Sequence, residues 1–307
     1  MIRWTAAGAV PTPTTVQIRV QRSYPGRIRA GAPVPTRSMS EPELVDNIHY
    51  FTEGLKGPRT QPCTGLVLSG VGVASRPDTP EAIKLARDLG ITRVVLHVGG
   101  EDLGDLDVVR FTGLVDVLVT PVQPETGALV EVCRVIQSAR ACGLQVAANT
   151  VLTANALPAL VRAARPIAKA CPDSMTFTYP FPINGNEATT APTPRRVMSA
   201  LRPALGILDR AGVHVQIKGL PACHLGDSTD RLGRTHNRYY VDADHQKDKA
   251  LMFFPDVVRF HKSDSCRFCT ADGQCDGFFS TYLRRPGFPQ LKPIGHTSAE
   301  DGHEELS

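Results

Sequence analysis

The chain has 307 residues, 42% of them hydrophobic, so it can bury a substantial core and is not globally disordered. Lys and Arg total 34 against 30 for Asp and Glu, and this small, scattered excess gives no support for a nucleic-acid partner. No run approaches the 18 apolar residues of a transmembrane helix, and the opening MIRWTAAGAVPTPTT is unlike a signal peptide. We therefore expect a cytoplasmic protein that does not associate with a membrane.

Short runs rich in Val, Ile and Thr alternate with longer helical patterns. The apolar runs predict strands at 15–20, 65–70, 92–99, 116–122, 145–153, 174–181 and 214–219. The intervening patterns predict helices at 42–57, 79–90, 126–143, 156–171 and 193–212, with a weaker one around 105–111. Such alternation is typical of a parallel sheet with right-handed crossovers. Six units and a seventh strand leave two α/β architectures open: a partial (β/α)6 barrel or a doubly wound open sheet.

The helix at 79–90 carries its own boundary signals. Thr79 is suited to cap its first turn, Pro80 fits the first helical position, and Gly90 can end it.

The alternation stops near residue 220. Residues 220–307 are rich in Gly, Pro, Asp and Cys, and the final dozen, HTSAEDGHEELS, are polar and acidic. We therefore divide the chain into a barrel part, 1–219, and a small Cys-rich extension, 220–307, whose tail is expected to be loose.

Three cysteines of the extension share a short polar stretch. Cys266, Cys269 and Cys275 have two and then five residues between them, and Cys223 could complete a set of four. In a cytosolic chain such thiols favour metal binding over disulfides. Thiolates suit an iron–sulfur cluster or zinc, so both remain open from the residues alone. His224, next to Cys223, is an alternative ligand.

The remaining cysteines have a simpler interpretation. Cys133, Cys142 and Cys171 fall within or at the ends of predicted helices, and Cys63 precedes a strand. We expect all four to be structural.

Two further patterns bear on ligand binding. The loop SGVGVAS has only the first two glycines of a dinucleotide fingerprint, which favours an ordinary glycine turn. Parallel α/β folds place their sites at the carboxyl ends of strands. The polar residues expected to line this mouth are Ser69, His97, Asn149, Tyr179 and Lys218.

The Cys-rich extension resembles the auxiliary-cluster domains, SPASM or twitch, of radical S-adenosylmethionine (radical SAM) enzymes. Those domains carry Cys-x2-Cys-x5-Cys, as Cys266, Cys269 and Cys275 do, often followed by a Gly and a Tyr, here Gly277 and Tyr282. An upstream cysteine often follows a proline after the last barrel strand, and LPACH places Cys223 correspondingly. A full SPASM pattern has another cysteine where this chain has Phe279, so the resemblance implies a single cluster.

The resemblance extends through the six strand–helix units. The segments MSEPELVDNI and FTYPFPINGN look like the first helix and the sixth-strand segment of a radical SAM core. The resemblance thus implies a partial (β/α)6 TIM-like barrel with the four cysteines Cys223, Cys266, Cys269 and Cys275 holding one iron–sulfur cluster, 4Fe-4S by analogy.

The chain departs from that family at its catalytic motif. A radical SAM core needs Cys-x3-Cys-x2-Cys after its first strand, but residues 23–40 contain no cysteine, and Tyr24, Ile28 and Gly31 occupy the aligned positions. The loop 69–77 also lacks the Glu of the loop that binds the methionine amine. Reductive cleavage of S-adenosylmethionine is therefore not expected.

These features favour an accessory protein of a modification or biosynthetic pathway, partnered by an intact radical SAM enzyme or binding a peptide or small molecule. The alternatives are an active redox enzyme that uses the remaining cluster and a binding module stapled by zinc.

Overall fold

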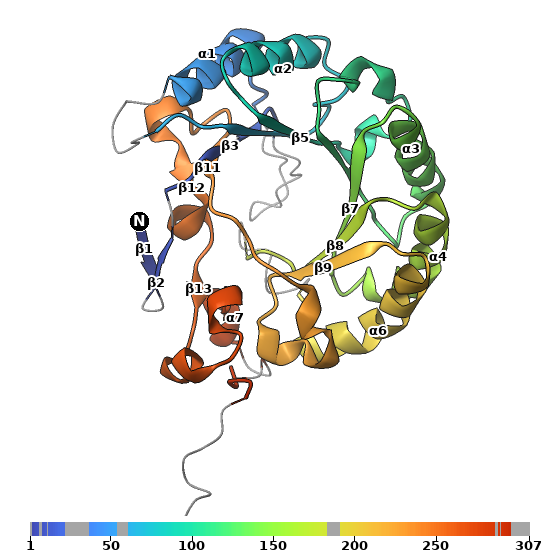
Figure 1. Ribbon diagram of the computed structural model, residues 1–307, viewed down its shortest axis with the longest axis vertical. Helices are drawn as coiled ribbons and strands as arrows, with labels where there is room; N and C mark the ends of the chain where they lie inside the picture. Colours follow the sequence, from blue (N-terminus) through green and yellow to red (C-terminus); the bar gives the residue numbers. More distant parts are fainter. Residues whose placement is uncertain are drawn as a thin grey trace, which may run out of the picture.

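A computed structural model describes residues 2–5, 8–10, 12–21, 37–53, 61–182, 191–285, 288 and 290–295. Its main body is a curved parallel sheet with helices on its outer face (Figure 1). The parallel strands are β3 (Thr15–Arg19), β4 (Gly65–Ser69), β5 (Arg93–His97), β6 (Val117–Pro121), β7 (Gln145–Val151), β8 (Ser174–Thr178) and β9 (His214–Lys218). The helices between them include α1 (Glu41–Thr52), α2 (Thr79–Asp88), α3 (Leu129–Ala141), α4 (Leu160–Ala170) and α6 (Pro194–Arg210).

The strand order decides between the two predicted architectures. From β3 to β9 every strand pairs in parallel with its neighbour in sequence, so the order never reverses as it would in a doubly wound sheet. Successive right-handed crossovers then leave the helices on one face, and the sheet curls into a partial barrel. The predicted partial (β/α)6 barrel is confirmed, and the sheet is not closed.

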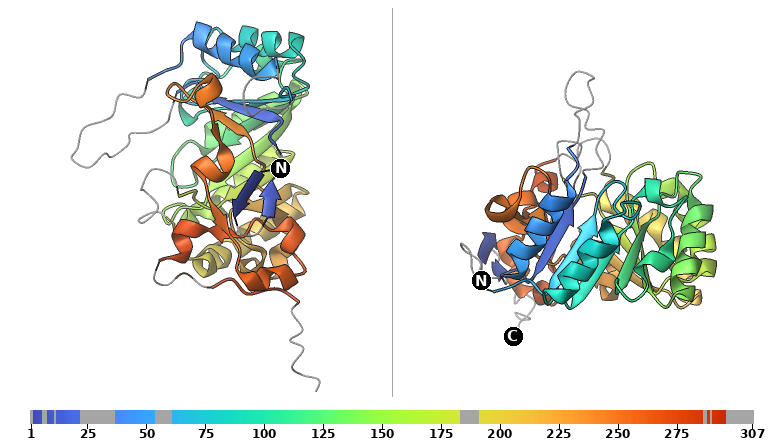
Figure 2. Two further views of the ribbon diagram at one scale, coloured as in Figure 1. Left: turned by 90° about the vertical axis from the view of Figure 1, so that its left-hand side faces the viewer. Right: turned by 90° about the horizontal axis from the view of Figure 1, so that it is seen from above.

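Side chains alternate between the two faces of each strand. On β3, Val16 and Ile18 are buried in the hydrophobic core beneath the helices, whereas Gln17 and Arg19 face the interior of the barrel. Figure 2 shows α1 and α2 side by side on the outer face, where they contact each other. Within the described part of the chain, no helix has the length and hydropathy to cross a membrane.

Two local expectations need correction. The segment 105–111 forms no α-helix; only a 3-10 turn, Val108–Phe111, lies there, started by the Asp107 carboxylate accepting from the Val109 N–H. Thr79 does not cap α2. It is the first helical residue, and its buried hydroxyl donates to the Val73 carbonyl at 2.6 Å. Gly90 does follow the helix with a φ of +97°.

The segment after residue 219 extends both edges of the sheet. Strand β10 (Leu232–Gly233) pairs in parallel with β9, and β11 (Tyr239–Val241) pairs in parallel with β3 and antiparallel with β12 (Leu251–Met252). A separate pair, β13 (Phe260–His261) and β14 (Phe278–Phe279), precedes α7 (Ser280–Leu283). The residues between β10 and β11 therefore connect the two sides of the open sheet, whose edge strands are β10 and β12.

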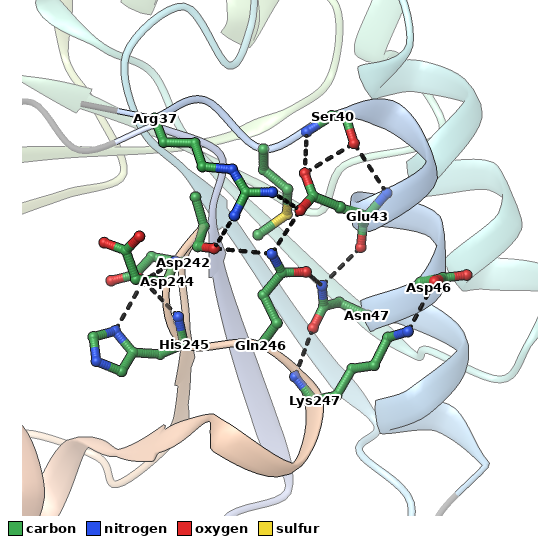
Figure 3. A network of polar contacts seen from close by, with 12 residues as sticks. Arg37, Ser40, Glu43, Asp46, Asn47, Asp242, Asp244, His245, Gln246 and Lys247 are labelled. Atoms are coloured by element: carbon green, nitrogen blue, oxygen red, sulfur yellow. Dashed lines mark hydrogen bonds and ion pairs between the residues drawn. The ribbon is translucent and has the colours of Figure 1, made fainter. Parts of the chain in front are cut away.

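A polar network fastens this segment to α1 (Figure 3). The buried amide of Asn47 donates to the Glu43 carbonyl at 2.7 Å and to Gln246 at 2.9 Å, and its oxygen accepts from the Lys247 N–H at 2.9 Å. The Glu43 carboxylate closes a capping box with Ser40 and also accepts from Gln246 at 2.9 Å. The Glu43 side chain therefore both caps the first turn of α1 and binds the segment after residue 219.

Candidate metal centre

Four cysteines from two separate segments line one small cavity. Cys223 lies in the 3-10 turn Ala222–His224, which follows β9. Cys266 lies in the turn Asp264–Phe268, Cys269 directly after it, and Cys275 directly after the turn Asp272–Gln274. The cavity is small, with a volume of about 20 Å³, and its wall also includes Lys262. The residues that sequence spacing grouped are therefore neighbours in space.

Backbone amides point at the sulfurs. The Sγ atom of Cys275 accepts from the N–H groups of Gly277 at 3.3 Å and Ala222 at 3.5 Å, and that of Cys269 accepts from the Ile294 N–H at 3.3 Å. Cys223 receives a backbone hydrogen bond from Lys292. Neutral thiols are weak acceptors, so this ring of fixed donors suits thiolates and tunes a metal–thiolate centre when one is bound.

Burial favours the protonated form of two of these thiols. The pKa of Cys223 is raised, first by burial and then by the neighbouring Cys275 and Cys266 thiols. Burial likewise raises the pKa of Cys275, against the backbone donors and the Lys262 ammonium, which lower it. A metal must displace those protons, so binding depends on pH and releases protons.

Lys262 also shapes the cavity wall. Its side chain is only 13% exposed, and its Nζ donates to the carbonyl and carboxylate oxygens of Asp272, at 2.7 and 2.8 Å. This links the strand β13 to the turn before Cys275. It also keeps a cation beside the thiols, where it would offset the charge of four thiolates.

A cluster of aromatic side chains, called here the aromatic bed, packs the cysteine-bearing loops against the barrel. Phe278 and Phe279 are fully buried, and Tyr282 stacks on Phe288 with ring centroids 5.5 Å apart. The Tyr282 hydroxyl donates to the Pro180 carbonyl at 2.9 Å. Tyr179 joins this bed, and its hydroxyl donates to Pro192, so it does not line the barrel mouth as expected.

The four cysteines expected to be structural lie elsewhere, and His224, the alternative ligand, makes an aromatic contact. Cys63 is in the barrel core, Cys133 lies on α3, Cys142 caps its end, and Cys171 ends α4 with a left-handed backbone. The ring of His224 packs against Phe278 at 6.2 Å, and its buried Nε2 has no hydrogen-bond partner in the described residues. Burial lowers the His224 pKa.

The four cysteines line one cavity without forming a compact ligand group within the described residues. Over the ranges that the structure describes, no three His, Cys, Asp or Glu side chains are grouped closely enough to bind a single metal ion. Four thiolates around one zinc ion lie about 3.8 Å apart, as zinc–sulfur bonds of about 2.3 Å require. Binding zinc would therefore require the loops to move inward.

The loop 69–77 has its backbone donors occupied. The Gly72 N–H donates to the Glu101 carboxylate at 3.1 Å, and the Ser75 N–H and hydroxyl donate to the buried Asp102 carboxylate at 3.2 and 2.5 Å. These acids stand where a nucleotide phosphate would bind, which agrees with a structural turn. The expected positions of the missing thiolates, Tyr24, Ile28 and Gly31, lie outside the described residues.

No protein-family model and no curated protein sequence matches the chain. Among solved structures, it is similar to Streptococcus suis SuiB bound to S-adenosylmethionine, with a TM-score of 0.52 and 8% identity over 76% of this chain and 59% of SuiB. It is also similar to SuiB bound to the precursor peptide SuiA, with a TM-score of 0.51 and 9% identity over 69% of this chain and 50% of SuiB. The chain thus spans between half and three fifths of SuiB and shares its fold over that part.

Proposed function

We propose that this chain is a radical-SAM-like iron–sulfur protein that binds one 4Fe-4S cluster through Cys223, Cys266, Cys269 and Cys275. We further propose that it acts as a non-cleaving accessory subunit in a modification or biosynthetic pathway. The observation that carries the proposal is the lining of one cavity by these four cysteines, with backbone donors directed at the sulfurs of Cys269 and Cys275.

A cluster fits this donor set better than a single ion. Its four irons stand apart from one another, so the ligand sulfurs are spaced around a volume, as they are around this cavity. When bound, the cluster would supply one-electron transfer and cross-link the loops. The chain's own part is to hold Cys275 with the amides of Ala222 and Gly277 and to offset negative charge with Lys262.

Two sequence features argue against cleavage of S-adenosylmethionine. Cleavage needs a cluster with an iron that no protein side chain occupies, and residues 23–40 offer no thiolate to hold one. A cluster bound by all four C-terminal cysteines has no open iron. The loop 69–77 lacks a Glu, and its amides are bound by Glu101 and Asp102.

The class of partner is proposed by analogy with SuiB, whose fold is similar. SuiB has been captured with a precursor peptide. We propose that this chain serves an intact radical SAM enzyme, or presents a peptide substrate to one, because it lacks the thiolates for its own radical generation.

Anaerobic reconstitution with iron and sulfide tests the metal centre. We expect about four irons per chain and a broad visible absorption that bleaches with dithionite. Cys223→Ser or Cys269→Ser should lose this absorption, whereas Cys133→Ser, which changes a half-buried cysteine on α3, should keep it. Stoichiometric zinc without visible absorption would instead establish the zinc-stapled module.

Incubation of the reconstituted protein with S-adenosylmethionine and dithionite tests the accessory role. We expect no catalytic formation of 5′-deoxyadenosine. Catalytic formation that disappears in Cys266→Ser would show that the chain is itself the enzyme.

A further inference from the structure

The ionisable side chains on the barrel strands are all basic. The strands β3 to β9 contain no Asp or Glu, and their ionisable residues are Arg19, Arg93, His97, His214 and Lys218. Arg93 and His214 begin their strands and are exposed at the amino end of the barrel. Arg19, His97 and Lys218 each end a strand, so they lie at the carboxyl end, where parallel α/β folds bind ligands.

These three side chains face inward. Each follows a fully buried core residue, Ile18, Leu96 or Ile217, and alternation along a strand puts it on the opposite face from the helices. The Arg19 guanidinium reaches the hydroxyl of Tyr240 on β11 at 3.5 Å, which agrees with this direction.

A fourth cation joins them from the segment that crosses between the sheet edges. Arg238 directly precedes β11, and its guanidinium lies 4.3 Å from the ring centre of Phe253. His97 is close enough to the three cations for their charges to act on it. Burial first, and then Arg238, Lys218 and Arg19, lower the pKa of His97 to about 4.

Two of these cations have no carboxylate partner in the part of the chain that the structure describes. Within the described residues, the side chains of Lys218 and Arg238 form no ion pair, and the buried Nε of Arg238 has no hydrogen-bond acceptor. The carboxylate that influences Lys218 is that of Asp276, which is already bound by the Thr235 N–H at 2.7 Å and by Arg234. Burial lowers the pKa of both Lys218 and Arg238.

Such an arrangement is unfavourable by itself. Burying a cation without a counter-charge costs free energy, and like charges placed together repel. A structural role would not need it, because inward positions elsewhere carry neutral groups such as Gln17, which donates to Ser69, and Asn149, which accepts from Thr178.

We propose that the mouth of the barrel binds the oxyanion group, phosphate or carboxylate, of a small ligand between Lys218 and Arg238. Arg19 adds positive charge, and neutral His97 is available as a hydrogen-bond partner. Lys and Arg are the side chains that bind such oxyanions most strongly. This site uses none of the four cysteines, so it stands independently of the proposed cluster.

Thermal unfolding of the full-length, cluster-reconstituted chain tests the proposal, with sodium phosphate and sodium succinate compared against sodium chloride at equal ionic strength. We expect Lys218→Met to raise Tm in chloride, because it relieves repulsion, and to lose the extra rise in Tm that the binding anion produces in the wild type. Phosphate stabilises folded proteins generally, so the quantity that matters is the difference between variant and wild type.

Calorimetric titration with the same two anions gives the affinity directly. Lys218→Met and Arg238→Met should each weaken binding about tenfold or more. Arg93→Met, which removes an exposed cation from the other end of β5, should bind as the wild type does. A response to phosphate alone or to succinate alone identifies the group.

Three results would overturn the proposal. The first is an equal response of wild type and Lys218→Met to both anions. The second is a lower Tm of Lys218→Met in chloride, and the third is a loss of affinity in Arg93→Met as large as in Lys218→Met.

Discussion

Gly277 shows how a single residue supports the cavity. Its φ is +85°, and a Cβ atom there would lie 2.3 Å from the carbonyl oxygen of His261. Glycine therefore lets the chain pass β13 closely enough for the Gly277 N–H to reach the Cys275 sulfur at 3.3 Å.

Gly277→Ala should therefore cost about 2 kcal/mol or more of stability, from the left-handed backbone and the close contact together. It should also weaken metal loading, because the amide moves away from the sulfur. Urea unfolding and iron content measure both effects. Gly273→Ala is the matched control, since a Cβ there meets nothing within 4 Å; equal losses in the two variants would contradict the argument.

At the scale of elements, the contact between α1 and the segment 242–247 shows how the extension is attached (Figure 3). Asn47 is completely buried and uses both its amide groups, and Glu43 serves helix and extension together. Removing a partner from such a network leaves buried groups unsatisfied, which costs more than the bond itself contributed.

Asn47→Leu should lower the free energy of unfolding by about 2 kcal/mol or more, because the Lys247 N–H and Gln246 lose their partner. Asp46→Ala, which breaks only the exposed pair with Lys247, should cost less than about 1 kcal/mol. Denaturant titration compares them. A loss in Asp46→Ala as large as in Asn47→Leu would show that the buried amide is not the main attachment.

The Glu43 carboxylate should make the free energy of unfolding depend on pH. A backbone hydrogen bond from Ser40 and a side-chain bond from Gln246 are the main causes that lower its pKa from 4.5 to about 2. Because the folded-state pKa lies below the unfolded one, its contribution is present above about pH 4.5 and is lost as pH falls towards 2.

Glu43→Gln should therefore be less stable than wild type at pH 7, and the difference should shrink as pH falls from 5 to 2. Chemical denaturation at several pH values measures this. Glu41→Gln removes the same charge from the same helical turn and should leave the pH dependence unchanged. A constant gap between Glu43→Gln and wild type over that range would refute the assignment.

At the scale of the whole molecule, the segment after residue 219 joins the two edges of the barrel sheet. It pairs with β9 through β10 and with β3 through β11, and it then forms the loops that carry Cys266, Cys269 and Cys275. Those loops have little regular structure, so we expect their order to depend on the metal and on the aromatic bed beneath them.

Cys266→Ala or Cys269→Ala, and likewise chelation of the wild type, should increase hydrogen exchange and proteolysis in residues 262–295 far more than in strands β4 to β7. Cys142→Ala, which changes a thiol at the end of α3, should leave both regions as they are. An unchanged exchange pattern in the metal-free protein would count against a structural role for the metal.

Much of the fold could be predicted from periodicity, because alternation of apolar runs and helical patterns is local. The strands of the barrel were derived in this way, whereas the grouping of Cys223 with Cys266, Cys269 and Cys275 came from their spacing and from the resemblance to auxiliary-cluster domains. Thr79 shows the limit: its residue type suits a helix cap, yet a tertiary contact with Val73 takes its hydroxyl.

The sequence by itself determined the parallel α/β class, the seven barrel strands, the spacing of the cysteines and the lack of cysteines in residues 23–40. Only the tertiary structure decided that the extension pairs with both edges of the sheet, that amides from residues 222, 277 and 294 face the sulfurs, and that Arg238 comes close enough to Lys218 for its charge to lower the Lys218 pKa. These contacts join residues far apart in the chain. They follow from sheet curvature and strand pairing, which no local pattern of residues encodes.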